Sequence, residues 1–316
     1  MPLDPVLRSL LDQMPPPPQG DIDYPALRQM AEAIIPAFIG PGGLVQVASV
    51  EESVVAGPVQ AVPLRIYRPL TEPRGTLHFI HGGGWTMGTL TSVDPAARRL
   101  CDALSMVVVS STYRLAPEHQ FPAGFEDSLA AARWVLDNLA TLGGEARPAA
   151  ISGDSAGGNL CAAITIALRE AGDDHRFDAQ LLLYPALDLR IEASRYASRV
   201  ADADPTLLAG AIETLRTAYC GDADPSDWRI SPLAAPDLAN LPPALIVVQT
   251  VDPLHDEALL YADRLREAGV SVEVLSFEHL THGFLHFSGL VPAAAEATRQ
   301  VAQHFFRMLS PVSTAA

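Results

Sequence analysis

A serine enclosed by small residues is the first feature of this sequence that could do chemistry. Ser155 lies in Gly153-Asp154-Ser155-Ala156-Gly157, which fits the pattern Gly-X-Ser-X-Gly. An apolar segment, 148–151, precedes it and a helical pattern follows it, so the sequence predicts a strand, a tight turn and a helix. Such a turn lifts a serine hydroxyl out of a sheet and exposes it as a nucleophile. An ordinary turn between a strand and a helix is the structural alternative, because glycine and serine are common.

A run of glycines supplies a second candidate element. His81-Gly82-Gly83-Gly84-Trp85 directly follows a predicted strand, 76–80. Glycines leave their backbone N–H groups uncovered, and these groups, together with the N–H of Ala156, could hold an oxyanion. A phosphate-binding loop is the alternative, but its pattern requires a lysine and none lies nearby. The glycine run therefore favours an oxyanion hole.

A carboxylate further along the chain could orient a catalytic base. Asp252 comes soon after a predicted strand, 245–248, and a carboxylate at the C-terminal end of a strand points to where α/β sheets bind ligands. It could accept the Nδ1–H of a histidine and stabilise the imidazolium. A carboxylate at a helix N-terminus is the alternative, which describes Asp256 and Glu257 better than Asp252.

The predicted base follows the last predicted strand, 272–277. His282 stands in His282-Gly283-Phe284, and the chain order serine, aspartate, histidine is that of α/β hydrolases. His279 and His286 lie nearby and are interpreted as surface or packing residues. We prefer His282 because Gly283 leaves room for a ring at a tight bend, and we expect a pKa of roughly 6.5 for it.

Taken together, these motifs resemble those of the hormone-sensitive-lipase-like esterases, the bacterial family IV. The similarity runs from about residue 60 to the C-terminus and includes Tyr113-Arg114-Leu115-Ala116-Pro117-Glu118-His119 and Phe121-Pro122-Ala123. The resemblance implies an α/β-hydrolase fold: a mainly parallel eight-stranded sheet with helices on both faces and a helical cap. Members often carry glycine in the loop just before the catalytic histidine, at the position where this sequence has His279. The site residues that the resemblance implies are the triad Ser155, Asp252 and His282, and the oxyanion donors Gly83, Gly84 and Ala156.

The expected activity is hydrolysis of carboxylic esters with short- to medium-chain acyl groups, through an acyl-enzyme on Ser155. The resemblance implies no cofactor and no metal. Some relatives bind a hormone without catalysis, with the histidine typically replaced, and others are dehydratases, with the serine usually replaced by threonine. Because Ser155 and His282 are present, the esterase is favoured. Amidase activity uses the same triad and stays open.

The predicted elements alternate between strands and helices, which indicates a mainly parallel sheet covered on both faces. Strands are predicted at 64–67, 76–80, 106–109, 179–184, 245–248 and 272–277. Helices are predicted at 122–140, 156–171, 255–268 and 292–309. The catalytic core is therefore expected to comprise residues 46–185 and 236–316.

Two segments fall outside this alternation. Residues 1–45 predict two short amphipathic helices, the first ended by Pro15 to Pro18, which cannot bury their apolar faces alone. The resemblance places them over the active-site mouth as cap helices. Residues 186–235 are polar, with one helical run from Pro205 to Tyr219, and are predicted to form a cap insertion. The apolar stripes of the N-terminal helices are Val6, Leu7, Leu10, Leu11 and Met14, then Leu27, Met30, Ile34 and Phe38.

Composition restricts the partners. The net charge of −16 argues against nucleic acid and against an anionic membrane surface. Three widely spaced cysteines match no metal-site spacing and suit a reducing cytosol. The N-terminus has no signal-peptide pattern, and no apolar run approaches the roughly 20 residues of a membrane helix. We expect a cytoplasmic monomer or homodimer that acts on a small-molecule ester.

Overall fold

The computed structural model describes residues 2–14, 22–172 and 177–309. Its centre is one eight-stranded sheet with the order β1-β2-β4-β3-β5-β6-β7-β8. Neighbours from β4 to β8 are parallel, whereas β2 is antiparallel to both β1 and β4. The α/β-hydrolase fold expected from the sequence is confirmed. The strands are β1 (Ser49–Ala56), β2 (Ala61–Arg68), β3 (Thr76–Ile80), β4 (Val107–Ser111), β5 (Ala149–Asp154), β6 (Ala179–Leu183), β7 (Ala244–Gln249) and β8 (Val272–Phe277).

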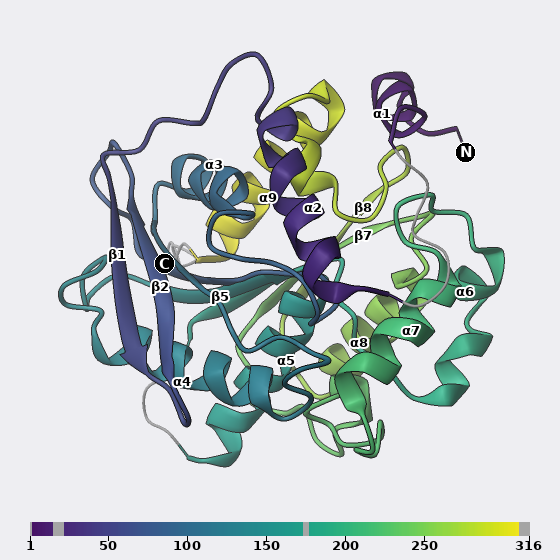
Figure 1. Cartoon of the computed structure of the whole chain (residues 1–316). Helices are drawn as coiled ribbons and strands as arrows, with labels where there is room; N and C mark the ends of the chain where they lie inside the picture. The colour runs from purple at the N-terminus through teal and green to yellow at the C-terminus, as the bar shows by residue number, and fades with distance from the viewer. Residues whose placement is uncertain (1, 15–21, 173–176, 310–316) are drawn as a thin grey trace, which may run out of the picture.

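Helices cover both faces of this sheet (Figure 1). The α-helices are α1 (Pro5–Leu11), α2 (Tyr24–Ile39), α3 (Asp94–Leu104), α4 (Ala123–Asp137), α5 (Ala156–Glu170), α6 (Ala197–Ala201), α7 (Ala209–Cys220), α8 (His255–Glu267) and α9 (Pro292–Leu309). Three short 3₁₀ helices are η1 (Ile191–Arg195), η2 (Pro232–Ala234) and η3 (Phe284–Phe287). Helices α3 and α9 pack on one face, and α4, α5 and α8 pack on the other. None of the helices within the described ranges is long and apolar enough to cross a membrane.

Strand β7 shows why the central strands are continuously apolar. Leu245 and Val247 point into the cluster with α3 and α9, whereas Ile246 and Val248 point into the cluster with α4, α5 and α8. Successive side chains of a strand face opposite sides of a sheet, so a strand covered on both faces needs apolar residues at every position. Strand β7 ends at Gln249, three residues before Asp252.

The structure adds two core elements that the sequence analysis did not predict. Strand β1 lies at the edge of the sheet and is mostly exposed, so it has no apolar run to identify it. Helix α3 buries Ala96, Ala97, Leu100, Cys101 and Leu104. That spacing follows a helical period, and the pattern could have been recognised in the sequence.

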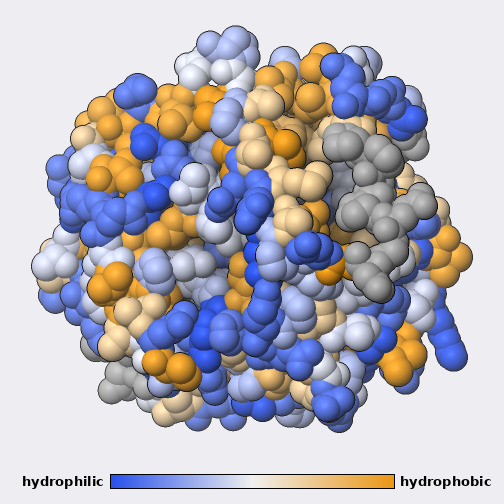
Figure 2. Space-filling model, viewed as in Figure 1, coloured by the Kyte–Doolittle hydropathy of each residue, from blue (hydrophilic) through white to orange (hydrophobic). Residues whose placement is uncertain are grey.

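The N-terminal helices differ in part from their prediction. Helix α1 buries Leu7 completely but ends at Leu11, and Pro15 to Pro18 lie outside the described residues. In α2, Met30 and Ile34 are exposed by 59% and 45%. The stripe predicted for α2 was therefore right at its ends, where Leu27 and Phe38 are half-buried, but wrong at Met30 and Ile34. The neighbouring residues Ala31 and Ile35 are half-buried in their place. On this side of the molecule, hydrophobic and hydrophilic residues are mixed along α2 (Figure 2).

The contacts of Arg28 determine which face of α2 is turned toward the rest of the molecule. The guanidinium of Arg28 donates hydrogen bonds to the carbonyl oxygens of Thr86 (2.7 Å) and Ala116 (2.8 Å) and pairs with Glu118 at 2.7 Å. These acceptors lie in the two loops that follow β3 and β4, so the Arg28 face of the helix must turn inward.

The segment 186–235 contains η1, α6, α7 and η2, and α7 begins at Ala209 rather than near Pro205. It packs against the core through α7. The ring of Tyr219 stacks on Trp85 with 4.6 Å between ring centroids, and its carbonyl accepts the N–H of Phe121 at 2.8 Å. The segment thus lies beside the glycine loop that follows β3.

Candidate active site

Ser155 occupies the turn between β5 and α5. Its backbone angles are φ 54° and ψ −117°, a strained conformation for a residue with a side chain. A Cβ atom on Gly157 would lie 2.0 Å from the carbonyl oxygen of Ile80, and one on Gly153 would lie 2.4 Å from the backbone of Gly157. Only glycine fits at those two positions, which explains the glycine spacing of the motif.

The structure brings Ser155, His282 and Asp252 together. His282 Nε2 lies 2.9 Å from Ser155 Oγ, and His282 Nδ1 lies 2.7 Å from Asp252 Oδ2. The carboxylate of Asp252 can only accept a hydrogen bond, so the tautomer of His282 with its proton on Nδ1 is favoured. Its Nε2 is then free to accept the proton of the serine hydroxyl. The N–H of Leu254 donates to the other oxygen of Asp252 at 2.8 Å, which fixes the carboxylate.

The charges around His282 change its pKa. Burial by itself lowers the pKa of this imidazole, but the charge of Asp252 and its hydrogen bond outweigh burial, and the charges of Asp204 and Asp154 add to them. The pKa of His282 is therefore raised above the ordinary value of 6.5 that the sequence analysis expected. The neutral, basic form of His282 is populated only at correspondingly higher pH.

The glycine loop leaves backbone donors available beside the serine. Gly83 and Gly84 have φ angles of 105° and 59°, a region that favours glycine. Among the described residues, none accepts a hydrogen bond from the N–H of Gly83, Gly84 or Ala156. Ala156 is the first residue of α5, where backbone N–H groups have no partner within the helix.

Asp154 links the nucleophile turn to the glycine loop. Its Oδ1 accepts the N–H of Gly82 at 2.8 Å, and its Oδ2 lies 3.0 Å from His286 Nε2. Burial raises the pKa of Asp154, but the hydrogen bond and charge of His286 outweigh it, so the pKa lies below its ordinary value. The sequence analysis treated His286 as a surface or packing residue and gave Asp154 no role. A motif position alone does not reveal a partner 132 residues away.

The remaining rival histidine lies away from the serine. His279 is exposed, and its Nδ1 lies 2.9 Å from the carbonyl oxygen of Pro2. Gly283 adopts φ 72°, the left-handed bend for which glycine was expected beside His282.

A cavity of about 230 Å³ opens between α2 and the glycine loop. Its lining is mainly apolar, with His286 as a polar group on the side of η3. Residues of α2 and of the loop that border it include Ile34, Ile35, Phe38, Gly83 and Met87. In the part of the chain that the structure describes, no group of three or more histidine, cysteine, aspartate or glutamate side chains is placed to hold a metal ion.

Comparisons with known proteins agree with this architecture. A family model described as alpha/beta hydrolase fold matches residues 77–286. Carboxylesterase NlhH of Mycobacterium tuberculosis is 38% identical over 305 residues, which cover 94% of this chain and 93% of that protein. The ethyl acetate hydrolase of Pseudomonas putida is 32% identical over 250 residues, 77% of each chain. A solved hyperthermophilic esterase from the archaeon Pyrobaculum calidifontis matches with a TM-score of 0.88 at 35% identity, covering 98% of this chain and 100% of that one.

Proposed function

Because the chain belongs to the α/β-hydrolase-fold family, in its hormone-sensitive-lipase-like branch, and is a serine carboxylesterase, we propose that Ser155, His282 and Asp252 are its catalytic triad. The observation that carries the proposal is the continuous pair of hydrogen bonds, 2.9 Å from Ser155 to His282 and 2.7 Å from His282 to Asp252. This arrangement has the chain order and geometry that acyl transfer through a serine requires.

In the proposed mechanism, His282 Nε2 removes the hydroxyl proton of Ser155 while Oγ attacks the carbonyl carbon of the ester. The carbonyl oxygen becomes an oxyanion, and we assign its binding to the N–H groups of Gly83, Gly84 and Ala156. The C–O bond to the alcohol breaks as the His282 imidazolium returns the proton to the leaving oxygen. Water then attacks the acyl-serine with His282 again acting as base, which releases the carboxylic acid and restores Ser155.

We also propose a preference for short- to medium-chain acyl groups. The cavity beside the glycine loop, at about 230 Å³, is smaller than the roughly 300–1,000 Å³ of pockets for drug-sized ligands. In this proposal residues 1–45 and 186–235 form the cap, over a core of 46–185 and 236–316. The contribution of α2 to the cavity and the packing of α7 on Trp85 support this division.

For the location we propose the cytoplasm. Cys101, Cys161 and Cys220 are all free and buried, which suits a reducing compartment. We also propose that the protein is a monomer or a homodimer. Light scattering of the purified protein distinguishes the two states.

Replacing Ser155 with alanine tests the triad. We expect a folded Ser155→Ala variant whose hydrolysis of p-nitrophenyl butyrate is reduced by on the order of 10⁶, because the covalent route is lost. Ser194→Ala is the matched control, since that hydroxyl caps only the carbonyl of Ile191 in η1. Mass spectrometry should find a phosphonate inhibitor attached to Ser155 in the parent protein and in Ser194→Ala, but no attached inhibitor in Ser155→Ala. More than about a hundredth of the parent activity in Ser155→Ala would overturn the triad.

A further inference from the structure

A second carboxylate, that of Asp204, binds the backbone of the proposed catalytic histidine. Asp204 lies between α6 and α7 and is completely buried. Its Oδ2 accepts the backbone N–H of His282 at 2.6 Å. Its Oδ1 accepts the N–H of Thr206 at 2.8 Å, and the Thr206 hydroxyl lies 2.6 Å from Oδ1 and 3.1 Å from the carbonyl oxygen of His282. The segment 204–206 therefore accepts the N–H of His282 and places the Thr206 hydroxyl, whose single proton is shared with Asp204, beside the C=O of His282.

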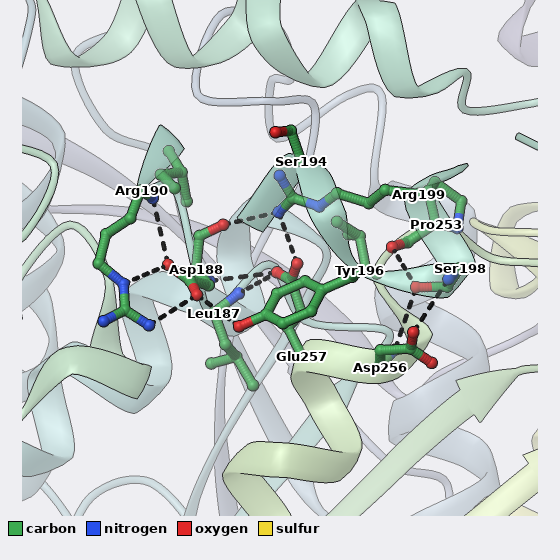
Figure 3. A network of polar contacts seen from close by, with 12 residues as sticks. Leu187, Asp188, Arg190, Ser194, Tyr196, Ser198, Arg199, Pro253, Asp256 and Glu257 are labelled. Carbon is green, nitrogen blue, oxygen red and sulfur yellow. Dashed lines mark hydrogen bonds and ion pairs between the residues drawn. The ribbon is translucent and has the colours of Figure 1, made fainter. Parts of the chain in front are cut away.

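The segment that carries Asp204 is itself fixed to the core by a buried ion pair (Figure 3). Arg199 of α6 and Glu257 of α8 are both buried, with 2.5 Å between Nη2 and Oε2. The other oxygen of Glu257 accepts the N–H groups of Leu187 (2.7 Å) and Asp188 (3.2 Å), and Arg199 also donates to the carbonyl of Asp188 at 2.6 Å. Both ends of the segment 187–199 are thus joined to one side chain of α8.

A second contact lies closer to the triad. The N–H of Ser198 donates to Asp256 Oδ2 at 2.9 Å, and its hydroxyl donates to the carbonyl of Pro253 at 2.9 Å (Figure 3). Pro253 directly follows Asp252. The same insertion therefore contacts the loop of Asp252 through Ser198 and the loop of His282 through Asp204, and it links these two loops in space.

The carboxylate of Asp204 is also one of the charges around the imidazole. Asp252 faces Nδ1 of His282, Asp154 lies at the end of β5, and the ring of Tyr184 meets the His282 ring edge-on at 4.9 Å between centroids. Asp204 adds a third negative charge from the insertion. Burial, with a smaller effect of the Asp252 charge, raises the pKa of Asp204 above its ordinary value, and the hydrogen bonds from His282 and Thr206 oppose that rise.

We propose that Asp204 is a positioning residue for the esterase reaction: it fixes the backbone of His282 and stabilises the imidazolium that forms when Ser155 is deprotonated. The inference rests on the proposed role of His282 as the base. The sequence gives no indication of it, because Asp204 lies in a polar segment 78 residues from its partner.

The isosteric variant Asp204→Asn separates the charge from the hydrogen bond. Asparagine can still accept the N–H of His282 through its one side-chain oxygen, while its amide nitrogen then faces Thr206. The contact with His282 is kept and that with Thr206 is weakened, so the maximal kcat should stay within a few-fold of the parent value. Removing the negative charge destabilises the imidazolium and lowers the pKa of His282. The acid limb of the kcat/KM profile, which in the parent enzyme lies above 6.5, should therefore move to lower pH by roughly 0.5–1 unit. Asp202→Asn is the matched control, because this exposed residue of the same loop binds only the N–H of Ala209.

The variant Asp204→Ala removes the hydrogen bond as well. We expect kcat to fall by roughly 10- to 100-fold with KM close to the parent value, since the base is displaced while the ester still binds. An Asp204→Asn profile that coincides with that of Asp202→Asn would overturn the inference, whether or not Asp204→Ala folds. His282→Ala, measured in parallel, keeps the two questions apart: if it retained activity, the proposed triad would fail, whereas an inactive His282→Ala with an unshifted Asp204→Asn would refute only the role of Asp204.

Discussion

The turn at Ser155 and the segment 186–235, the proposed insertion, contribute to the candidate site in different ways. Around Ser155 the structural requirements are local: Gly153 and Gly157 clear the turn, and α5 begins at the next residue. In the insertion, each contact with the site spans a long stretch of chain. Asp204 meets a residue 78 positions away, and Arg199 meets one 58 positions away. The reacting groups are thus specified by short motifs, whereas their mutual orientation depends on distant packing.

This difference predicts unequal effects for neighbouring histidines, and the largest effect is expected at the triad. His282→Ala should reduce kcat/KM by on the order of 10⁵–10⁶, because the proposed base, which lies 2.9 Å from Ser155 Oγ, is lost. His279→Ala should keep most of the activity, since that ring contacts only the carbonyl of Pro2. Steady-state hydrolysis of a p-nitrophenyl ester compares the two. An inactive His279→Ala beside an active His282→Ala would reverse the assignment.

The same difference explains what the sequence could predict. The strand ranges 76–80 and 272–277 coincide with β3 and β8, and the helix 292–309 coincides with α9, because the apolar pattern of each segment reflects how that segment alone packs, fully buried in β3 and half-buried in β8. The residues of the proposed triad stand in motifs that could be recognised one by one. Asp204 could not be found in this way, because a lone aspartate in a polar loop has the same local pattern as the exposed Asp202.

Removing the ion pair between Arg199 and Glu257 tests how much it contributes to the stability of the protein. In Arg199→Met the carboxyl of Glu257 stays buried without its partner, so the free energy of unfolding should fall by about 3–5 kcal/mol. Urea unfolding followed by circular dichroism measures this change. Arg266→Met is the matched control: its pair with Asp263 is exposed on the same helix, and its loss should leave stability nearly unchanged.

The pH dependence of this loss gives a further check on the same variant. In the parent protein, burial raises the pKa of Glu257 to about 7, and Arg199 opposes that rise. Without Arg199 the carboxyl should take up a proton more readily in the folded state. A folded pKa above the unfolded value means that stability falls as pH rises through that interval. The destabilisation should therefore be larger at pH 8 than at pH 6. An equal loss at both values would show that lost packing, rather than the unpaired charge, dominates.

The smallest effect is expected on α2, where the predicted stripe included Leu27 and Phe38 but missed the half-buried Ile35. Ile35 is half-buried and borders the cavity beside the glycine loop, whereas Met30 is 59% exposed and does not line it. Ile35→Ala should enlarge the cavity and move the preferred acyl length upward. It should also lower kcat/KM on short acyl esters by up to about tenfold, since one methylene in an apolar pocket contributes about 1–3 kcal/mol to discrimination between substrates. Met30→Ala removes similar apolar volume from the same helix and should leave the acyl-length profile unchanged. A series of p-nitrophenyl esters of increasing chain length measures both variants. If the two profiles shifted alike, α2 would act on the site only through its overall position, and the cavity beneath it would not set the acyl preference.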